Sequence, residues 1–246
     1  GYVLEDDNHN VLPRNAVLDN NAEVITVANC RNHQYELRLD GNDTIRGICK
    51  HCLHRSGVVK LSAEDCLYDG QPHGADKRCA QEENWEVTLT HYDSDGRELE
   101  NLPVDAGTYT AKLTCKAFGQ EQSIEVTYTI SMADIADHVR IYWEPTNYDA
   151  QPKQVELTKP DSDAHCLSEG VDYTITYEPV DSADTLQEGL PVNAGDYKVT
   201  VKGIGNYTGT VTEIYIGKDE TGTPFYKQVM EIHPAWLEVE EDTVTA

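Results

Sequence analysis

Four metal-binding side chains near the N-terminus are the residues whose types and spacing best suit chemistry. Cys30 and His33 are separated by two residues, and Cys49 and Cys52 form a second pair with the same gap. This gap lets both side chains of a pair reach one tetrahedral ion, and three thiolates with one imidazole are a common structural zinc set. The sequence therefore predicts a structural zinc site at Cys30, His33, Cys49 and Cys52. Four protein ligands leave no position for a catalytic water.

The segment between the two pairs predicts a β-hairpin that positions these ligands. Tyr35, Leu37 and Leu39 alternate with polar residues, residues 41–43 (Gly-Asn-Asp) predict a turn, and residues 44–48 lead back to the second pair. This is the plan of a zinc ribbon. A ribbon with so few apolar residues cannot offset its backbone entropy alone. Metal removal is therefore expected to unfold residues near 30–60 and to leave the rest of the chain folded.

Two alternatives to this site stay open. Cys49 and Cys52 can form a disulfide or remain free, with His33 as a surface residue, because a zinc site in an oxidising compartment is open to oxidation. His51 and His54 are alternative ligands. Cys52 is preferred over both because it completes the second pair with a gap of two residues.

Four cysteines remain outside the predicted site: Cys66, Cys79, Cys115 and Cys166. An even number permits two disulfides in three connectivities, and the sequence does not choose among them. Cys115 lies on the apolar side of a predicted strand, so we expect a buried free thiol there. A bridge between Cys79 and Cys115 is the alternative.

An internal repeat organises the rest of the chain. Tyr-Asp-Gly-Gln-Pro at 68–72 recurs as Tyr-Asp-Ala-Gln-Pro at 148–152, and Leu-Pro-Val-Asp-Ala-Gly at 102–107 recurs as Leu-Pro-Val-Asn-Ala-Gly at 190–195. Two landmarks in the same order indicate a duplicated domain. The predicted segments are a zinc-ribbon-like module (1–61), two β-repeats (62–131 and 132–217), and a C-terminal extension or the start of a truncated third unit (218–246).

Hydrophobic residues recur with a period of two inside each repeat, which predicts strands. Tyr109, Ala111, Leu113 and Cys115 share the expected inward face in the first repeat, and Tyr197, Val199 and Val201 share it in the second. Closing strands are expected at 124–130 and 214–216. The predicted fold is all-β: two tandem immunoglobulin-like β-sandwich repeats, or a β-grasp-like arrangement as the alternative, behind a small zinc-ribbon-like module.

The landmarks, followed by Gly-Asn-Tyr-Thr-Gly-Thr-Val at 205–211, resemble the Tyr-Asp-Gly and mucin-binding-type (MBG-like) β-repeats of large bacterial cell-surface proteins. The resemblance covers about residues 62–217. The first repeat departs from the pattern, because Ala-Phe-Gly-Gln-Glu at 117–121 stands where Gly-Asn-Tyr-Thr-Gly is expected. The resemblance implies export and a role in building or displaying a surface structure. It does not imply catalysis, and no family catalytic residue can be carried over.

The net charge and the absence of catalytic motifs argue against several classes of function. Acidic residues outnumber basic ones by 44 to 19, and the net charge of −25 repels phosphate backbones and anionic lipids, so nucleic-acid binding is not expected. No apolar stretch approaches the length of about 18 residues that predicts membrane insertion. The sequence contains no nucleophile elbow, zinc-protease motif or nucleotide-binding glycine loop.

The expected function is that of a non-enzymatic module of a secreted or cell-wall-attached bacterial protein. It would serve as a stalk, spacer or adhesion repeat, with neighbouring domains of the same long chain as its partners. The alternative is a domain that binds carbohydrates or host glycoproteins through exposed aromatic residues, for which the candidates are Tyr142, Trp143, Tyr207 and Trp236.

Overall fold

A computed structural model describes residues 2–5, 26–30, 32–80, 84–159, 167–181 and 186–235. Within these residues every regular element is a strand, apart from one 3-10 turn, η1 (Ile135–Asp137). The predicted all-β class is therefore confirmed. No helix in the described part of the chain is long and apolar enough to cross a membrane.

The chain divides into two compact units. The first unit contains residues 1–66 and 71–131, and the second contains residues 67–70 and 132–246. The main division after Ser131 coincides with the boundary predicted between the two repeats.

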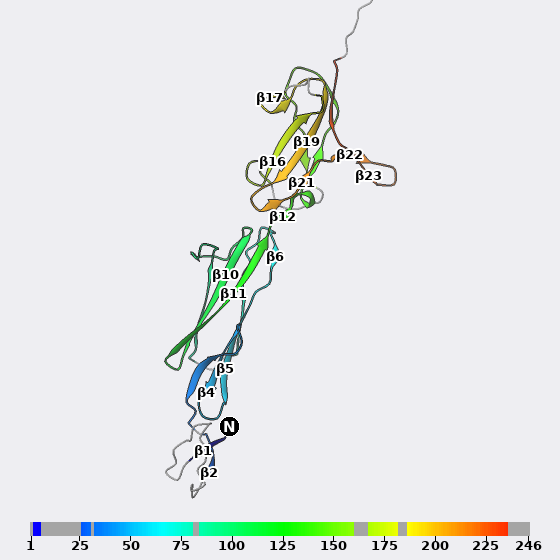
Figure 1. Cartoon of the computed structure of the whole chain (residues 1–246). Helices are drawn as coiled ribbons and strands as arrows, with labels where there is room; N and C mark the ends of the chain where they lie inside the picture. Colours follow the sequence, from blue (N-terminus) through cyan, green and yellow to red (C-terminus); the bar gives the residue numbers. More distant parts are fainter. Residues whose placement is uncertain are drawn as a thin grey trace, which may run out of the picture. The chain divides into compact units, whose positions relative to one another are not determined.

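The first unit consists of two facing sheets and a small strand pair (Figure 1). We name the sheet with the order β3-β4-β5-β7 its hairpin sheet: Tyr35–Leu39, Thr44–Cys49, Arg55–Ser62 and Asp76–Ala80. Its main sheet has the order β6-β11-β10-β8-β9: Cys66–Leu67, Gln120–Ser131, Gly107–Ala117, Glu86–Tyr92 and Glu98–Leu99. The separate pair is β1-β2: Tyr2–Glu5 and Thr26–Asn29.

One core joins the two sheets of the first unit. The hairpin sheet contributes Leu37, Ile45, Val59 and Leu61, and the main sheet contributes, among others, Leu113, Cys115 and Ile124. The predicted alternation along β10 is confirmed, since every second side chain from Ala111 to Ala117 is buried. Tyr109 is an exception, because it is only half-buried. Tyr128, its register partner on β11, is the aromatic residue that is fully buried there.

The second unit is also a two-sheet sandwich. Its hairpin sheet has the order β15-β13-β22-β23: Glu156–Thr158, Arg140–Tyr142, Ile214–Lys218 and Pro224–Lys227. Its main sheet has the order β14-β24-β19-β16, with β21 also paired to β19: Thr146–Asn147, Met230–His233, Gly195–Gly203, Tyr173–Pro179 and Thr210–Val211. Short strands complete the unit: β12 (Ala133–Asp134) beside β20 (Tyr207–Thr208), and β17 (Leu186–Gln187) beside β18 (Leu190–Pro191). Ile141 and Ile214 face Tyr197, Val199 and Val201 in one core.

The same register of strand pairing occurs in both units, and it shows where the repeat begins. Lys60 pairs with Arg78 across β5 and β7, and Arg140 pairs with Thr158 across β13 and β15, each position shifted by 80 residues. The predicted boundary between residues 61 and 62 therefore falls inside β5. Because β5 pairs with β4 on one edge and with β7 on the other, this strand connects the N-terminal hairpin to the first repeat.

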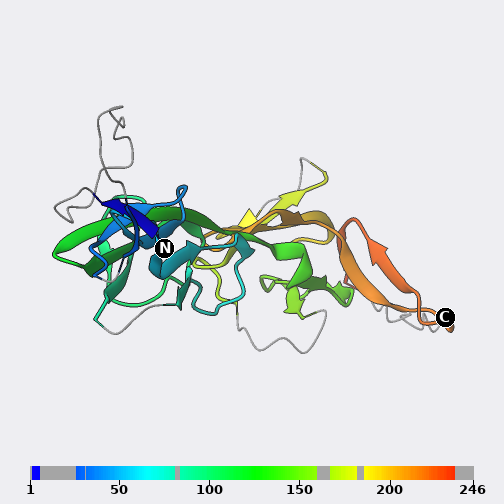
Figure 2. The ribbon, with the colours of Figure 1, turned by 90° about the horizontal axis from the view of Figure 1, so that it is seen from below.

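The prediction that residues 214–216 form the closing strand of the second repeat is wrong. Residues 214–216 lie in β22, which pairs in parallel with β13 in the hairpin sheet, and Ile216 is 40% exposed. The strand that corresponds to β11 is split, because β21 pairs with one end of β19 and β24 pairs with the other. The insertion between them forms the β22-β23 hairpin, orange in Figures 1 and 2. The boundary predicted after residue 217 falls within β22, and residues 236–246 lie outside the described part.

Both units carry the same tyrosine hydrogen bond. The Tyr109 hydroxyl donates to the Asp105 carbonyl at 2.8 Å, and the Tyr197 hydroxyl donates to the Asn193 carbonyl at 3.0 Å. A tyrosine at the start of a strand that bonds back to a carbonyl a few residues upstream is typical of immunoglobulin-like sandwiches.

Candidate metal centre

Four side chains converge beyond the end of the β3-β4 hairpin. Cys30 follows β2, His33 precedes β3, Cys49 ends β4, and Cys52 lies in the turn that leads to β5. The ligand atoms of these four residues all lie within 4.8 Å of one another. The structure thus brings together all four residues that the sequence singled out, and they form the only such group of metal-ligating side chains in the described residues.

Backbone hydrogen bonds shape the second ligand pair. The Cys49 N–H donates to the His54 carbonyl at 2.8 Å, and the Leu53 N–H donates to the Cys49 carbonyl at 3.1 Å. Leu53 has a left-handed φ of 60°, which reverses the chain sharply after Cys52. His33 comes close because β3 and β4 pair Tyr35 with Cys49, directly beside the two ligand pairs.

The interatomic distances suit one tetrahedral ion. Zinc–sulfur bonds of about 2.3 Å imply that two sulfur ligands lie about 3.8 Å apart across a tetrahedron. The Sγ atoms of Cys30 and Cys49 are 3.8 Å apart, and the Cys52 Sγ lies 3.3 Å from the His33 Nδ1. A disulfide requires sulfur atoms at about 2.05 Å, and all three cysteines are free thiols.

The electrostatics of the group favour one thiolate before any ion binds. Burial raises the pKa of Cys49, but hydrogen bonds from the Cys52 and His51 backbone N–H groups and from the His33 ring outweigh it and lower this pKa to about 5. Burial raises the pKa of Cys30 to about 12, and the neighbouring Cys52 and Cys49 thiols add to the effect. A divalent cation would offset the repulsion that contributes to the raised pKa of Cys30.

His54 is a neighbour of the cluster and not a member of it. Its ring stacks on the ring of His33 with centroids 4.5 Å apart, and its Nδ1 lies 3.0 Å from the Tyr35 Oη. The group of four contains Cys52 and neither His51 nor His54. His54 therefore supports the orientation of the His33 ring, as residues around metal-ligating histidines commonly do.

We name β3 and β4 the metal hairpin. The tip of the β10-β11 hairpin contacts it. The Gln120 side-chain oxygen accepts a hydrogen bond from the Leu37 N–H at 2.8 Å. The Phe118 ring lies 5.3 Å from the Tyr35 ring and 5.9 Å, edge to face, from the Trp85 ring. An aromatic path thus runs from Tyr35, next to the metal ligands, into the core of the first unit.

This contact explains the sequence departure at residues 117–121. Phe118 and Gln120 stand where the second repeat has its Gly-Asn-Tyr-Thr-Gly turn, and both contact the metal hairpin. Sequence reasoning missed this role, although the departure itself was visible. Only the fold shows that the position faces another hairpin.

Trp85 packs on a glycine pair that joins β4 to β5. Gly47 and Gly57 are register partners, and a Cβ atom on either would lie 2.7 Å or 2.9 Å from the Trp85 ring. Glycine is therefore required at both positions for the indole to lie against the sheet. Trp85 is 7% exposed, and this contact fixes the metal hairpin on the core.

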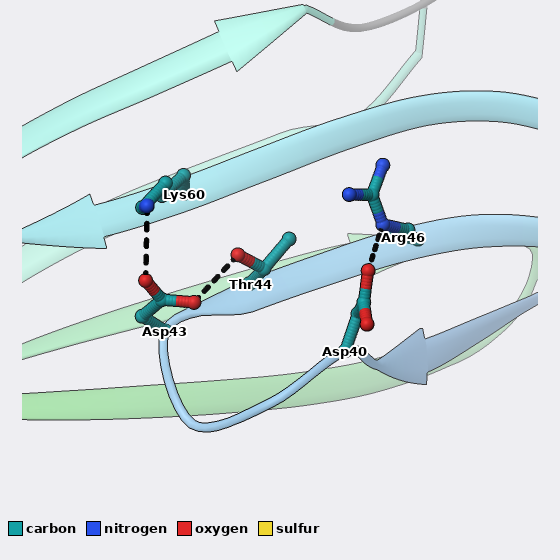
Figure 3. A network of polar contacts seen from close by, with 5 residues as sticks. All are labelled: Asp40, Asp43, Thr44, Arg46 and Lys60. Atoms are coloured by element: carbon teal, nitrogen blue, oxygen red, sulfur yellow. Dashed lines mark hydrogen bonds and ion pairs between the residues drawn. The ribbon is translucent and has the colours of Figure 1, made fainter.

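Polar contacts hold the end of the metal hairpin that lies away from the ligands (Figure 3). Asp43 accepts a hydrogen bond from the Thr44 hydroxyl at 2.7 Å and pairs with Lys60 of β5 at 3.1 Å. Arg46 pairs with Asp40 across the same turn. The hydrogen bond from Thr44 and the Lys60 ammonium lower the pKa of Asp43. These pairs are exposed, so we expect each to contribute little to stability.

Two of the three described aromatic residues proposed for glycan binding are buried. Trp143 and Tyr207 are 9% and 3% exposed, and both belong to the core of the second unit. Tyr142 is half-buried with its ring 6.5 Å from that of Tyr215, and Trp236 lies outside the described residues. The described members of this set therefore do not form an exposed aromatic platform.

Comparisons with known proteins assign no family to the chain. No protein-family model matches it, and no curated protein does. Among solved structures, a variant of three immunoglobulin domains of titin carrying glutamate-to-alanine substitutions matches 96% of this chain and 88% of its own, with 10% identity and a TM-score of 0.27. A TM-score this low supports no conclusion about fold or function.

Proposed function

We propose that the four-residue centre binds one structural zinc ion, and that this ion holds the metal hairpin in place as half of the hairpin sheet of the first unit. The convergence of Cys30, His33, Cys49 and Cys52 within 4.8 Å carries the proposal. Three sulfurs and one imidazole are the donor set that zinc prefers in closed structural sites. A full set of protein ligands supports a role in folding, since it offers no position to a substrate or a water.

We further propose that the whole chain is a non-enzymatic module of an extracellular or cell-wall-attached surface protein, acting as a stalk, spacer or adhesion repeat. Two sandwiches with the same strand register support this role, because tandem repeats also occur in the surface proteins that the chain resembles. The resemblance to MBG-like surface repeats supports the location. The glycan-binding alternative has less support, because two of its four aromatic residues are buried.

Metal analysis of the purified chain tests the zinc proposal. Protein prepared reduced and with zinc present should hold about one equivalent of zinc, and Cys49→Ser should lose it. Cys66→Ser is the matched control, because Cys66 lies outside the group of four, and it should keep the ion. Zinc that is retained by Cys49→Ser, or that is absent from the parent chain, would refute the proposal.

A further inference from the structure

Two thiols outside the metal centre face the same interior from opposite sheets of the first unit. Cys79 on β7 is the register partner of Val59 on β5, and register partners in an antiparallel pair point to the same side of the sheet. Val59 is completely buried in the core, so Cys79 lies on the inward side of the hairpin sheet. Cys115 on β10 of the facing main sheet is also completely buried in that core.

The two thiols are close enough to influence each other. Burial raises the pKa of Cys115 to about 11, and the negative charge of Cys79 adds to the effect. The residues of β7 are exposed along the whole strand, and β7 is an edge strand held by its ladder to β5. Both cysteines are free thiols in the structure, and Cys79 is open to a reagent in solution.

The second unit lacks both cysteines together. The shift of 80 residues places Lys159 at the position of Cys79, and the shift of 88 residues places Gly203 at the position of Cys115. A Cβ atom on Gly203 would lie 2.8 Å from the Thr208 carbonyl oxygen, so a cysteine does not fit there. The two cysteines are therefore features of the first unit alone.

Cys66 is not an alternative partner for Cys115. It lies on β6, which is separated from β10 by β11 in the main sheet. The charge of Cys66 acts on Tyr128, and Tyr128 pairs with Tyr109, which is six residues before Cys115 on β10. Six residues of extended strand span roughly 20 Å, which is beyond the reach of a disulfide.

We propose that Cys79 and Cys115 form a disulfide that joins the two sheets of the first unit. A low-molecular-weight disulfide is the oxidant. The Cys79 thiolate attacks it and releases one small thiol, and the Cys115 thiolate then attacks the mixed disulfide and releases the second. The two cysteines lose two protons and two electrons, and the oxidant is reduced to two thiols. The bond would fix β7, and it does not depend on the metal.

Oxidation of the full zinc-loaded chain with oxidised glutathione tests the proposal. After free thiols are blocked, the unreduced digest is analysed by mass spectrometry. The expected result is a peptide pair linked through Cys79 and Cys115. Glutathione held on Cys79 with Cys115 free, no modification of either residue, or a link from either one to a different cysteine would overturn the proposal.

Melting of the first unit provides a second readout. Oxidation closes a long loop, so it should raise the melting temperature of the first unit by at least about 5 °C and leave the second unit unchanged. Cys79→Ser, a change on an exposed edge strand, should abolish the rise, and Cys66→Ser should preserve it. A rise that survives in Cys79→Ser would contradict the assignment.

Discussion

The two units fill the same sheet positions with unrelated hairpins. In the first unit, β4 and β3 extend the sheet beyond β5, and in the second unit β22 and β23 extend it beyond the corresponding strand β13. The first hairpin comes from before the repeat and meets β5 antiparallel, whereas the second is inserted near the end of the repeat and meets β13 in parallel. The repeat itself therefore supplies only two strands of this sheet, and each copy recruits the other two from elsewhere.

The two hairpins are also held by different means. On the second, the rings of Tyr215 and Tyr226 lie 5.9 Å apart, and the Tyr142 ring of β13 lies 6.5 Å from that of Tyr215. Such cross-strand aromatic pairs stabilise sheets. The first hairpin packs Leu37 and Ile45 into the core, and it also has a candidate metal centre at one end and exposed ion pairs at the other. The comparison indicates that the first hairpin combines core packing with a candidate metal centre, whereas the second carries cross-strand aromatic pairs.

The largest expected effect is the loss of stability on alanine substitution of a tyrosine, and it should differ between two equivalent tyrosines. Tyr197 is completely buried, whereas Tyr109 is half-buried. Tyr197→Ala should destabilise the second unit by about 3 to 5 kcal/mol, the usual cost of deleting a buried aromatic residue. Tyr109→Ala should cost the first unit less than half of that. Chemical denaturation of each variant measures both costs, and equal costs would show that the two cores are built alike.

A smaller loss of stability is expected when the contact between Phe118 and the metal hairpin is removed. Phe118→Ala should destabilise the first unit by about 1 to 3 kcal/mol, because it removes the aromatic link between Tyr35 and Trp85. The matched control is Phe225→Ala on the hairpin of the second unit. Phe225 is 51% exposed and Phe118 is 42% exposed, so the two variants differ mainly in the ring contacts of Phe118 with Tyr35 and Trp85. The loss of Phe225 should change stability by less than about 0.5 kcal/mol. Calorimetry of both variants checks the difference, and similar losses would mean that Phe118 does not couple the hairpin to the core.

Much of the fold could be predicted from sequence because its signals are local. Alternation of apolar residues placed the inward faces of β10 and β19, and the spacing of Cys30, His33, Cys49 and Cys52 identified the candidate site. The parallel pairing of β22 with β13 could not be predicted, because an inserted hairpin shows the same alternation whichever sheet it joins. The role of Phe118 could not be predicted either, because it depends on a contact with Tyr35, which lies 83 positions away in the chain.

The smallest expected effect is a pH dependence confined to the first unit. His91 and Tyr177 occupy equivalent positions: the His91 Nε2 accepts the Ala75 N–H at 3.2 Å, and the Tyr177 hydroxyl accepts the Val155 N–H at 3.1 Å. Burial lowers the pKa of His91 below its usual 6.5. The unfolded chain therefore takes up the proton first, and stability that is fully present above pH 6.5 is lost as the pH falls. The loss is at most about 1.4 kcal/mol per pH unit.

His91→Gln isolates this effect from protonation of the metal ligands, since glutamine keeps an acceptor and does not titrate. Denaturation of the zinc-loaded chain and of the variant is compared between pH 7.5 and 5.5. The stability of the first unit should fall more steeply in the parent chain than in the variant. Parallel pH profiles would show that His91 does not contribute.

Hydrogen exchange of the zinc-loaded chain, with and without a chelator, tests most directly whether the metal completes the first sandwich. Because Leu37 and Ile45 of the metal hairpin share a core with Leu113, the account predicts that chelation increases exchange in β3, β4, β5 and the adjoining halves of β10 and β11, with no change in the second unit. An increase confined to residues 30–60, as the sequence alone predicts, or no increase at all, would contradict it.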